Sequence, residues 1–333
     1  MYRELGQVTL KNGEQVNAGV VIGPDLEWAD RAEGLLGHKG EIWRWGNKMV
    51  LRNDLGLDVF YYVLHRDGEP FTNMMNIESR GVGLFGHVFT KPEDRQQGAA
   101  GALMPLLMED FRSRGGQALY LGTGYDSHPF HLYAKNGFFG VEPRSGLMAY
   151  YLDSEAAFYA SYFQGEAEIE TLKWTHWPAA DPLFTGNFKG TVRSTVMRIM
   201  GRSSTEGPMI PLERAEIKRQ EDGEGPRSVV LPIQETGAVA GFATFGRHPL
   251  WSGTWTVDVY CHPEYWDQGT ELFATMEFPP AERLLAYCDS GFDEKEKVLK
   301  EAGFEPITTF ENRVAADEAR TQFVTVREWE KIL

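Results

Sequence analysis

The chain has 333 residues, of which 42% are hydrophobic and 24% charged, as is usual for a soluble globular protein with one large or two ordinary domains. Its formal net charge of −15 repels phosphate backbones, so we expect no nucleic-acid partner and an attraction for amine ligands. An acidic surface that serves only solubility accounts for this charge equally well. Two cysteines cannot form a disulfide framework, and no apolar run is long enough for a membrane span, so we expect a cytoplasmic protein without a membrane partner.

The first half of the chain alternates β-rich runs, glycine turns and amphipathic stretches. β-Branched and aromatic residues indicate strands, and apolar residues three or four positions apart indicate helices. Pro105 predicts a kink in the longest helix, because proline lacks the backbone N–H that continues the helical hydrogen bonds. The predicted elements are a strand at 16–22, a helix capped by Asp25, a hairpin at 57–78, a strand at 82–89, a helix at 97–114, a strand at 118–122, a short helix at 129–136 and a strand pair at 138–152.

The second half repeats this order at a spacing of domain size. Residues 184–193 are similar to residues 35–44, and further matches follow. We therefore predict two domains, residues 1–156 and 157–333, with the boundary inside 153–168. The expected elements of the second half are a hairpin at 229–245, strands at 257–260 and 284–287, and a last helix that ends at Gly303.

A helix start rich in small residues follows the strand at 82–89. The backbone N–H groups at such a helix start and the helix dipole attract anions. Gly98, Ala99 and Ala100 would let a pyrophosphate approach closely, and Arg95 adds a positive charge. Taken alone, this pattern more often reflects simple packing.

A second motif, the sequence HLYAKNGF at residues 131–138, gives this helix start its context. Arg95, Gly98 and Ala100 form an R-x-x-G-x-A turn. This turn followed by the second motif resembles the GNAT superfamily of acyl-CoA-dependent N-acyltransferases, and the resemblance covers the first predicted domain. The resemblance implies an α/β fold for each domain. Its sheet is mixed and mostly antiparallel, with a splayed central pair of parallel strands flanked by helices.

The resemblance also implies roles for individual residues. Acetyl-CoA or another short acyl-CoA is the co-substrate, no metal is needed, and Tyr133 protonates the departing thiolate. His87 and Glu78 are candidates for the base that removes the proton of the amine, and His128 and His131 are alternatives, although any one histidine is more often an ordinary residue. The residues expected along the cofactor are Val88, Phe89, Thr90, Arg95, Gln96, Gln97, Gly98, Ala99, Ala100 and Asp126.

Two of these positions depart from the family pattern. Gln96 and Gln97 stand where a basic or glycine-rich pair is usual, and Asp126 stands near a frequent asparagine. Both departures predict a modest cofactor affinity. His128 and His131 have helical spacing for two metal ligands, but no third ligand accompanies them, so we expect no metal site.

The corresponding segments of the second half have lost the key residues. Trp266 replaces the arginine of the turn, and Asp267 and Glu271 put negative charge where a pyrophosphate would bind. Leu299 replaces the tyrosine and cannot donate a proton. We therefore expect a degenerate C-terminal copy that packs against the first domain and helps to form the substrate cleft.

The sequence thus predicts an acetyl-CoA-dependent N-acetyltransferase that acylates a small-molecule or peptide amine by direct attack. Two alternatives stay open, a non-catalytic acyl-CoA sensor or interaction module and an aminoacyl-tRNA-dependent transferase built from two such domains. The acidic charge and the intact turn argue against the second. Mycothiol synthase-like enzymes also have tandem copies, but with the C-terminal copy active. An exposed sheet edge leaves a homodimer open.

Overall fold

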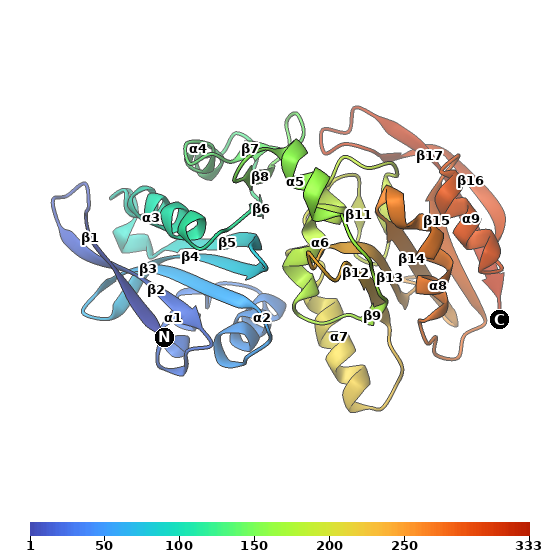
Figure 1. Cartoon of the computed structure of the whole chain (residues 1–333), viewed down its shortest axis with the longest axis horizontal. Helices are drawn as coiled ribbons and strands as arrows, with labels where there is room; N and C mark the ends of the chain where they lie inside the picture. Colours follow the sequence, from blue (N-terminus) through green and yellow to red (C-terminus); the bar gives the residue numbers. More distant parts are fainter. The chain divides into compact units, whose positions relative to one another are not determined.

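The computed structural model describes all residues from Met1 to Leu333, in two compact units (Figure 1). Unit 1 comprises Met1–Val141 and Gly146–Phe158, and unit 2 comprises Glu142–Ser145 and Tyr159–Leu333. Each unit is built around its own mixed sheet with helices packed on it, so the predicted α/β class is confirmed. No helix is long and apolar enough to cross a membrane.

The sheet of unit 1 has the strand order β1-β2-β3-β4-β5-β6-β8-β7. All neighbouring strands are antiparallel except β5 and β6, which are parallel. The strands are β1 (Tyr2–Thr9), β2 (Gln15–Gly23), β3 (Asp58–Arg66), β4 (Glu69–Ser79), β5 (Val82–Thr90), β6 (Ala118–Gly122), β7 (Phe139–Gly140) and β8 (Leu147–Tyr151).

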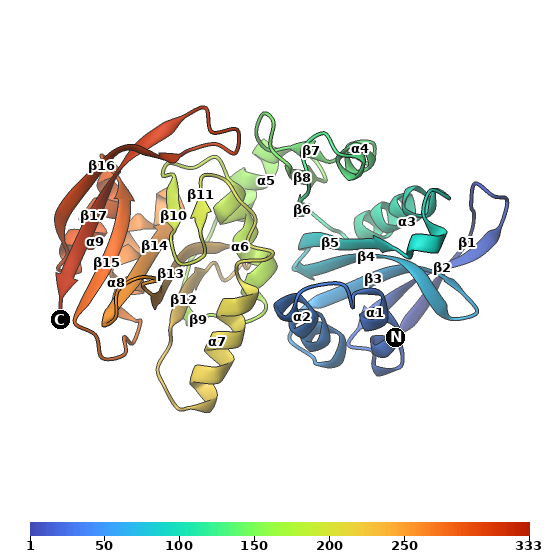
Figure 2. The same cartoon turned by 180° about the vertical axis from the view of Figure 1, so that it is seen from behind.

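Helices α1 and α2 cover one face of this sheet and α3 covers the other (Figures 1 and 2). The Asp25 carboxylate caps α1 by accepting hydrogen bonds from two backbone N–H groups, as expected. The helix α3 continues through Pro105, because that residue lies on the exposed face, where water can satisfy the freed carbonyl. The helices are α1 (Leu26–Leu35), α2 (Glu41–Arg52), the 3₁₀ turn η1 (Pro92–Asp94), α3 (Ala99–Ser113), α4 (His128–Ala134) and α5 (Glu155–Tyr162).

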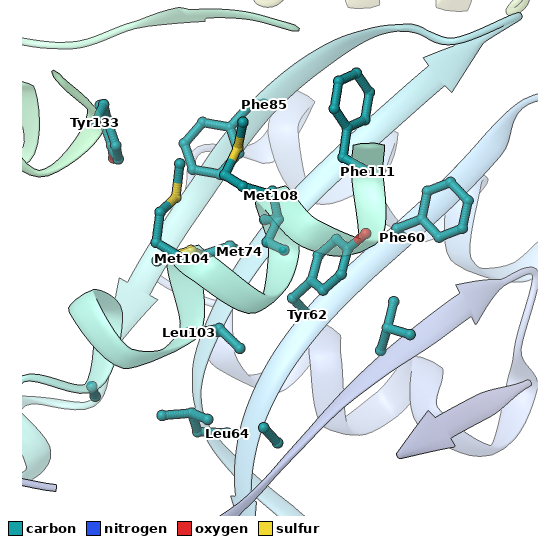
Figure 3. Packing of buried hydrophobic residues seen from close by; sticks show 14 of the residues in the cluster. Phe60, Tyr62, Leu64, Met74, Phe85, Leu103, Met104, Met108, Phe111 and Tyr133 are labelled. Atoms are coloured by element: carbon teal, nitrogen blue, oxygen red, sulfur yellow. The ribbon is translucent and has the colours of Figure 1, made fainter. Parts of the chain in front are cut away.

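The core of unit 1 lies between the sheet and α3 (Figure 3). Tyr62 and Met74 from the central strands meet Leu103, Met104 and Met108 of the helix. Each fully buried side chain of this kind stabilises the fold by about 1.5–3 kcal/mol. This packing fixes α3 on the sheet, so the start of the helix stays close to the end of β5.

Unit 2 has a sheet with the order β16-β17-β15-β14-β13-β12-β9, in which only β14 and β15 are parallel. Helices α6 and α7 lie on one side of it and α8 and α9 on the other (Figures 1 and 2). Its elements are β9 (Glu170–Thr171), α6 (His176–Thr185), β10 (Val192–Ser194), β11 (Ile199–Met200), α7 (Ile210–Glu221), β12 (Ser228–Pro232), β13 (Val239–Arg247), β14 (Thr254–Cys261), η2 (Pro263–Gln268), α8 (Gly269–Ala274), β15 (Arg283–Asp289), α9 (Asp293–Glu301), β16 (Glu305–Ala315) and β17 (Phe323–Ile332).

The similarity between residues 35–44 and 184–193 holds for only part of the structure. Both segments begin with the end of a helix, α1 in unit 1 and α6 in unit 2. Unit 1 then continues into α2, whereas unit 2 continues into the short strand β10. The two units therefore differ in the connection that crosses this face of each sheet.

Candidate functional site

The two parallel strands of unit 1 separate after a short paired stretch. β5 pairs with β6 only from Val82 to Leu84, although β5 runs on to Thr90. Beyond Leu84, the edge of β5 that faces β6 has no strand partner, and such an edge can pair with an extended ligand. The splayed parallel pair within a mostly antiparallel sheet is the arrangement that the sequence resemblance implied. Unit 1 has the GNAT fold.

A β-bulge lies in the unpaired part of β5. The partners of Asn73 and Met75 on β4 are Phe89 and Gly86, so β5 carries one extra residue at this point. His87 lies in this bulge. Its φ is 52°, a left-handed conformation that few non-glycine residues adopt. The Asn73 amide donates a 2.8 Å hydrogen bond to the His87 carbonyl and holds the bulge in place.

The bulge also sets the directions of the next two predicted cofactor residues. Val88 packs against the core on the α3 side, and the ring of Phe89 stacks on His38 at a centroid distance of 4.3 Å. The hydroxyl of Thr90 accepts a hydrogen bond from Thr72 at 3.2 Å. The side chains of this segment are thus engaged within the protein, and only its backbone faces the gap between the strands.

The turn before α3 leaves the first N–H groups of the helix without acceptors. Gln96 and Gly98 have φ values of 66° and 79°, which turn the chain sharply into the helix. The N–H of Ala102 donates to the Gly98 carbonyl at 3.0 Å, whereas the three N–H groups before it have no helical acceptor. No side chain caps the helix and no acidic residue lies in its first turn. An anion can therefore bind here.

Two cationic residues border this turn. Arg95 is exposed, donates from Nε to the Thr90 carbonyl at 3.1 Å and forms no ion pair. Lys11, from the β1–β2 turn, donates its backbone N–H to the Gln97 carbonyl at 3.0 Å. Its Cγ lies 3.4 Å from the point where a Cβ on Gly98 would stand. Sequence reasoning missed Lys11, because only the folded sheet brings residue 11 beside residue 98.

One arginine pairs with two of the three acidic residues near the turn, and the third, Glu93, is exposed. Arg66 binds Glu14 at 2.5 Å and Asp94 at 2.8 Å. The hydrogen bond from Arg66 lowers the pKa of Glu14. Arg95 and Lys11 have no carboxylate partner of this kind, so both can bind an anion at the turn.

Tyr133 lies at the splayed end of the sheet. It is on α4, a short helix whose start is capped by Ser127, which accepts from the Phe130 N–H at 3.3 Å. Its ring meets that of Phe85 edge to face at 5.2 Å, and Phe85 is the first residue of β5 beyond the paired stretch (Figure 3). With 6% of its surface exposed, Tyr133 is embedded beside the gap.

Asp126 lies in the loop between β6 and α4 and has a left-handed φ of 56°. Its side chain is exposed and binds the imidazole of His131 at 2.9 Å. This contact engages both Asp126 and one of the alternative bases on α4. The proximity of Asp126 to a cofactor stays a prediction.

The expected role of Glu78 as the catalytic base stays a prediction, and its carboxylate is engaged in an ion pair. On the β4–β5 ladder Glu78 is opposite Gly83, two positions before Phe85, the first residue of β5 beyond the paired stretch. Arg114 binds the buried Glu78 carboxylate through two hydrogen bonds of 2.8 and 2.9 Å. Burial raises the pKa of Glu78, while Arg114 opposes that shift. Glu78 is part of a structural charge network.

His87 lies beside the gap but is a weak base in this structure. Only 5% of its surface is exposed, neither ring nitrogen has a hydrogen-bond partner, and the ring meets Trp43 edge to face at 5.2 Å. Burial, together with the nearby Lys39 and His38, lowers the pKa of His87 to about 3. The imidazole is therefore neutral at neutral pH and has little affinity for a proton.

Acid should destabilise unit 1 through His87. Below its ordinary pKa of 6.5, the unfolded chain binds a proton that folded His87 does not bind until about pH 3. The contribution of His87 to the free energy of unfolding therefore falls as the pH drops from 6.5 to about 3, by up to about 1.4 kcal/mol per pH unit. We expect His87→Asn, which tolerates the left-handed backbone, to flatten this slope in hydrogen-exchange measurements on β4 and β5 amides. The exposed His128→Asn should leave the slope as it is.

The equivalent turn in unit 2 is filled by side chains. β14 and β15 also pair at only three positions, from Thr254 to Thr256, before they separate. Trp266 is only 8% exposed and packs against Phe292 at 5.1 Å. A Cβ on Gly269, at the start of α8, would lie 2.8 Å from the Val298 side chain. The side chains of Trp266 and Val298 therefore crowd this helix start.

The β10–β11 hairpin lies across the separated strands of unit 2. The Asp258 carboxylate on β14 accepts hydrogen bonds from residues 194–196, at 2.7–2.9 Å from two backbone N–H groups and a serine hydroxyl. Asp289 on β15 accepts from two N–H groups just before and in β10, at 2.6 and 2.8 Å. The buried Lys295 ammonium donates to a carbonyl of β10 at 2.8 Å. Unit 2 thus bridges its splayed pair with its own chain.

Comparisons with solved structures find acetyltransferases that match about half of this chain. A ribosomal-protein-alanine N-acetyltransferase from Brucella melitensis is 16% identical, with a TM-score of 0.36, and the match covers 50% of this chain and 99% of that one. An N-acetyltransferase from Staphylococcus aureus is 16% identical, with a TM-score of 0.37, and the match covers 50% of this chain and 99% of that one. A proposed acetyltransferase from Salmonella typhimurium was solved with its cofactor acetyl-CoA. It is 16% identical, with a TM-score of 0.39, and the match covers 51% of this chain and 95% of that one. No protein-family model and no curated protein sequence matches the chain.

Proposed function

We propose that unit 1 is an N-acyltransferase that transfers an acetyl or other short acyl group from acyl-CoA to an amine. The observation that carries this proposal is the convergence of three features at one end of the sheet. These are the unpaired edge of β5 beyond Leu84, the cationic helix start at Arg95–Ala100, and the embedded Tyr133. Together they offer an extended channel, a site for phosphate groups and a proton donor.

The fit to acyl-CoA follows from the chemistry of these groups. The free backbone edge of β5 at Val88–Thr90 can hydrogen-bond to the amide groups of a pantetheine arm as a strand would. The N–H groups of Ala99 and Ala100, with the guanidinium of Arg95, can hold a pyrophosphate. Lys11 can add a second positive charge. Acyl-CoA supplies the reactive thioester, and the protein orients it and provides the hydrogen bonds and charges that hold it.

The reaction that this arrangement supports is a direct transfer. The nitrogen of the amine bonds to the thioester carbon while a backbone N–H of β5 stabilises the oxyanion. The carbon–sulfur bond then breaks, and Tyr133 gives its hydroxyl proton to the sulfur. The additional proton of the amine passes to water, because His87 is a weak base and the Glu78 carboxylate is bound by Arg114. The acceptor therefore reacts as a neutral amine, and turnover should increase with pH.

We also propose that unit 2, approximately the predicted domain 157–333, is a second copy of the fold that does not use acyl-CoA. The buried Trp266 and the bridging β10–β11 hairpin support this reading. Leu299, which stands in the position of Tyr133 when the two motifs are compared, is buried and has no proton to give. A structural role for unit 2 follows.

The test is a calorimetric titration of acetyl-CoA into the full chain and into two charge-matched variants. Arg95→Gln and Gln268→Glu each make the net charge one unit more negative, the first at the turn of unit 1 and the second at the turn of unit 2. We expect one site per chain. Arg95→Gln should weaken binding about tenfold to a hundredfold, the usual value of a hydrogen bond to a charged group, whereas Gln268→Glu should have no effect.

Two outcomes would overturn the assignment. Equal weakening by both variants would mean that Arg95 acts only through the overall charge. Binding that is lost in Gln268→Glu alone would place the cofactor in unit 2. Binding at unit 1 without turnover on any amine would favour the alternative of an acyl-CoA sensor.

A further inference from the structure

Unit 2 contains a pocket of about 390 Å³ that plays no part in the proposed acyl transfer. It lies where β13 ends and β14 begins, next to the residues that follow β10. Its volume falls in the range of small-molecule sites. The polar residues that line it include Thr195, Arg198, Arg227, Arg247, His248 and Tyr287.

The lining of this pocket is cationic although the protein is acidic. Arg198, Arg227 and Arg247 contribute three guanidinium groups, and no aspartate or glutamate lines the pocket. None of the three arginines forms a salt bridge with a carboxylate, in a chain with 48 acidic and 33 basic residues. A cluster of guanidinium groups without a lining carboxylate is suited to an external anion.

The nearest acidic residues are occupied elsewhere. Glu328 accepts a hydrogen bond from the Tyr287 hydroxyl at 2.8 Å. Glu216 accepts from the backbone N–H groups of Arg227 and Ser228 at 3.2 and 3.1 Å. Glu216 still contributes a favourable charge to Arg227, whereas the exposed Arg198 and Arg247 have no carboxylate partner.

Arg227 gives the pocket a fixed cationic wall. Its Nε donates to the Phe245 carbonyl at 2.6 Å, and one terminal nitrogen lies 3.3 Å from the point where a Cβ on Gly246 would stand. Burial lowers the pKa of Arg227, and the nearby Glu216 opposes that shift only in part. An arginine stays charged in such a place, and an anion would relieve the unfavourable desolvation.

His248 adds a neutral hydrogen-bond donor. Its Nδ1 accepts from the backbone N–H groups of Leu250 and Trp251, both at 3.2 Å, so the proton of the neutral ring is on Nε2. The imidazole stacks on Trp251 with a centroid distance of 4.2 Å and an interplanar angle of 6°. The ring is thus held in one orientation at the pocket.

We propose that this pocket binds a small organic anion through a phosphate or carboxylate group. Planar guanidinium groups match both oxyanions through paired hydrogen bonds. Arg227 forms the fixed wall, and the exposed Arg198 and Arg247 close on the anion from the rim. The site is independent of the proposed transferase activity, since none of its residues belongs to unit 1.

The proposal is tested by calorimetric titration of pyrophosphate and, separately, of citrate into the full chain. The background variant is Arg95→Gln, so that the helix start of unit 1 does not add its own anion signal. We expect one site per chain, and a tenfold or greater loss of affinity in Arg198→Gln/Arg247→Gln. Both side chains are exposed, so the double variant should fold normally.

The matched control is Arg313→Gln/Arg320→Gln, which removes the same charge from exposed positions of unit 2 outside the pocket. It should leave the affinity unchanged. Binding of pyrophosphate alone would identify a phosphate site, and binding of citrate alone a carboxylate site. The proposal fails if neither anion binds at millimolar concentration, or if the pocket and control variants lose affinity equally.

Discussion

Replacing Tyr133 with phenylalanine is expected to lower kcat by about 10²- to 10⁴-fold, the usual contribution of a positioned general acid, while the affinity for acetyl-CoA stays nearly unchanged. The substitution removes only the hydroxyl, and the aromatic ring keeps its edge-to-face contact with Phe85 at 5.2 Å. The thiolate must then leave without its proton donor. The measurement is the release of free CoA thiol with a panel of primary amines, beside a calorimetric titration of acetyl-CoA.

Tyr150→Phe is the matched control. Tyr150 belongs to the same buried cluster and packs against Phe138 at 5.8 Å, but it is on β8 and has no role in the proposed chemistry. Its kcat should equal that of the wild type. An unchanged kcat in Tyr133→Phe would disprove the assigned acid, and an equal decrease in both variants would indicate a general disturbance of the core.

Arg114→Met is expected to lower the free energy of unfolding of unit 1 by about 3 kcal/mol. Arg114 binds the buried Glu78 and, at 3.1 Å, Asp110, whose carboxylate also accepts a 2.6 Å hydrogen bond from the Tyr62 hydroxyl. Without the guanidinium, Glu78 remains in the core without its counter-charge, which commonly costs about 3–5 kcal/mol, whereas Asp110 keeps its ion pair with Arg3 at 2.5 Å. We choose the lower value because the Arg114 side chain is 24% exposed.

Hydrogen exchange of the β3 and β4 amides measures this loss, since the slowest amides of a core report its global opening. Adding Glu78→Gln to Arg114→Met should recover part of the stability, because one buried charge is then removed. Arg112→Met, on the exposed side of the same helix end, should cost little. A loss in Arg112→Met as large as that in Arg114→Met would show that the network is not the cause.

The sequence revealed the elements with regular patterns. The Asp25 cap, the buried runs of β3 to β5 and the apolar face of α3 all carry a helical or alternating period, and each was predicted. β1, β16, β17 and the helix α2 were not predicted. β1 is an edge strand, and β16 is exposed along most of its length, so neither has the alternating apolar face that indicates a strand.

The site could be predicted only where local sequence determines it. The helix start at Gly98 and the short helix of Tyr133 are local motifs, and both lie near the splayed strands. The bulge at His87 depends on the register between two strands. The ion pair of Glu78 depends on Arg114, which lies 36 residues further along the chain. Such pairings arise from the tertiary fold and leave no local pattern.

The β10–β11 hairpin has a consequence for how the two units resist unfolding and proteolysis. A ligand that binds only the folded state increases stability by RT ln(1 + [L]/Kd). In unit 2 the bridge across β14 and β15 is covalently part of the chain, so its contribution is constant. In unit 1 the unpaired edge of β5 has no such bridge, and on the proposed function its contribution follows the concentration of acyl-CoA. The survival of unit 1 would then depend on the supply of its own substrate, while unit 2 persists unaided.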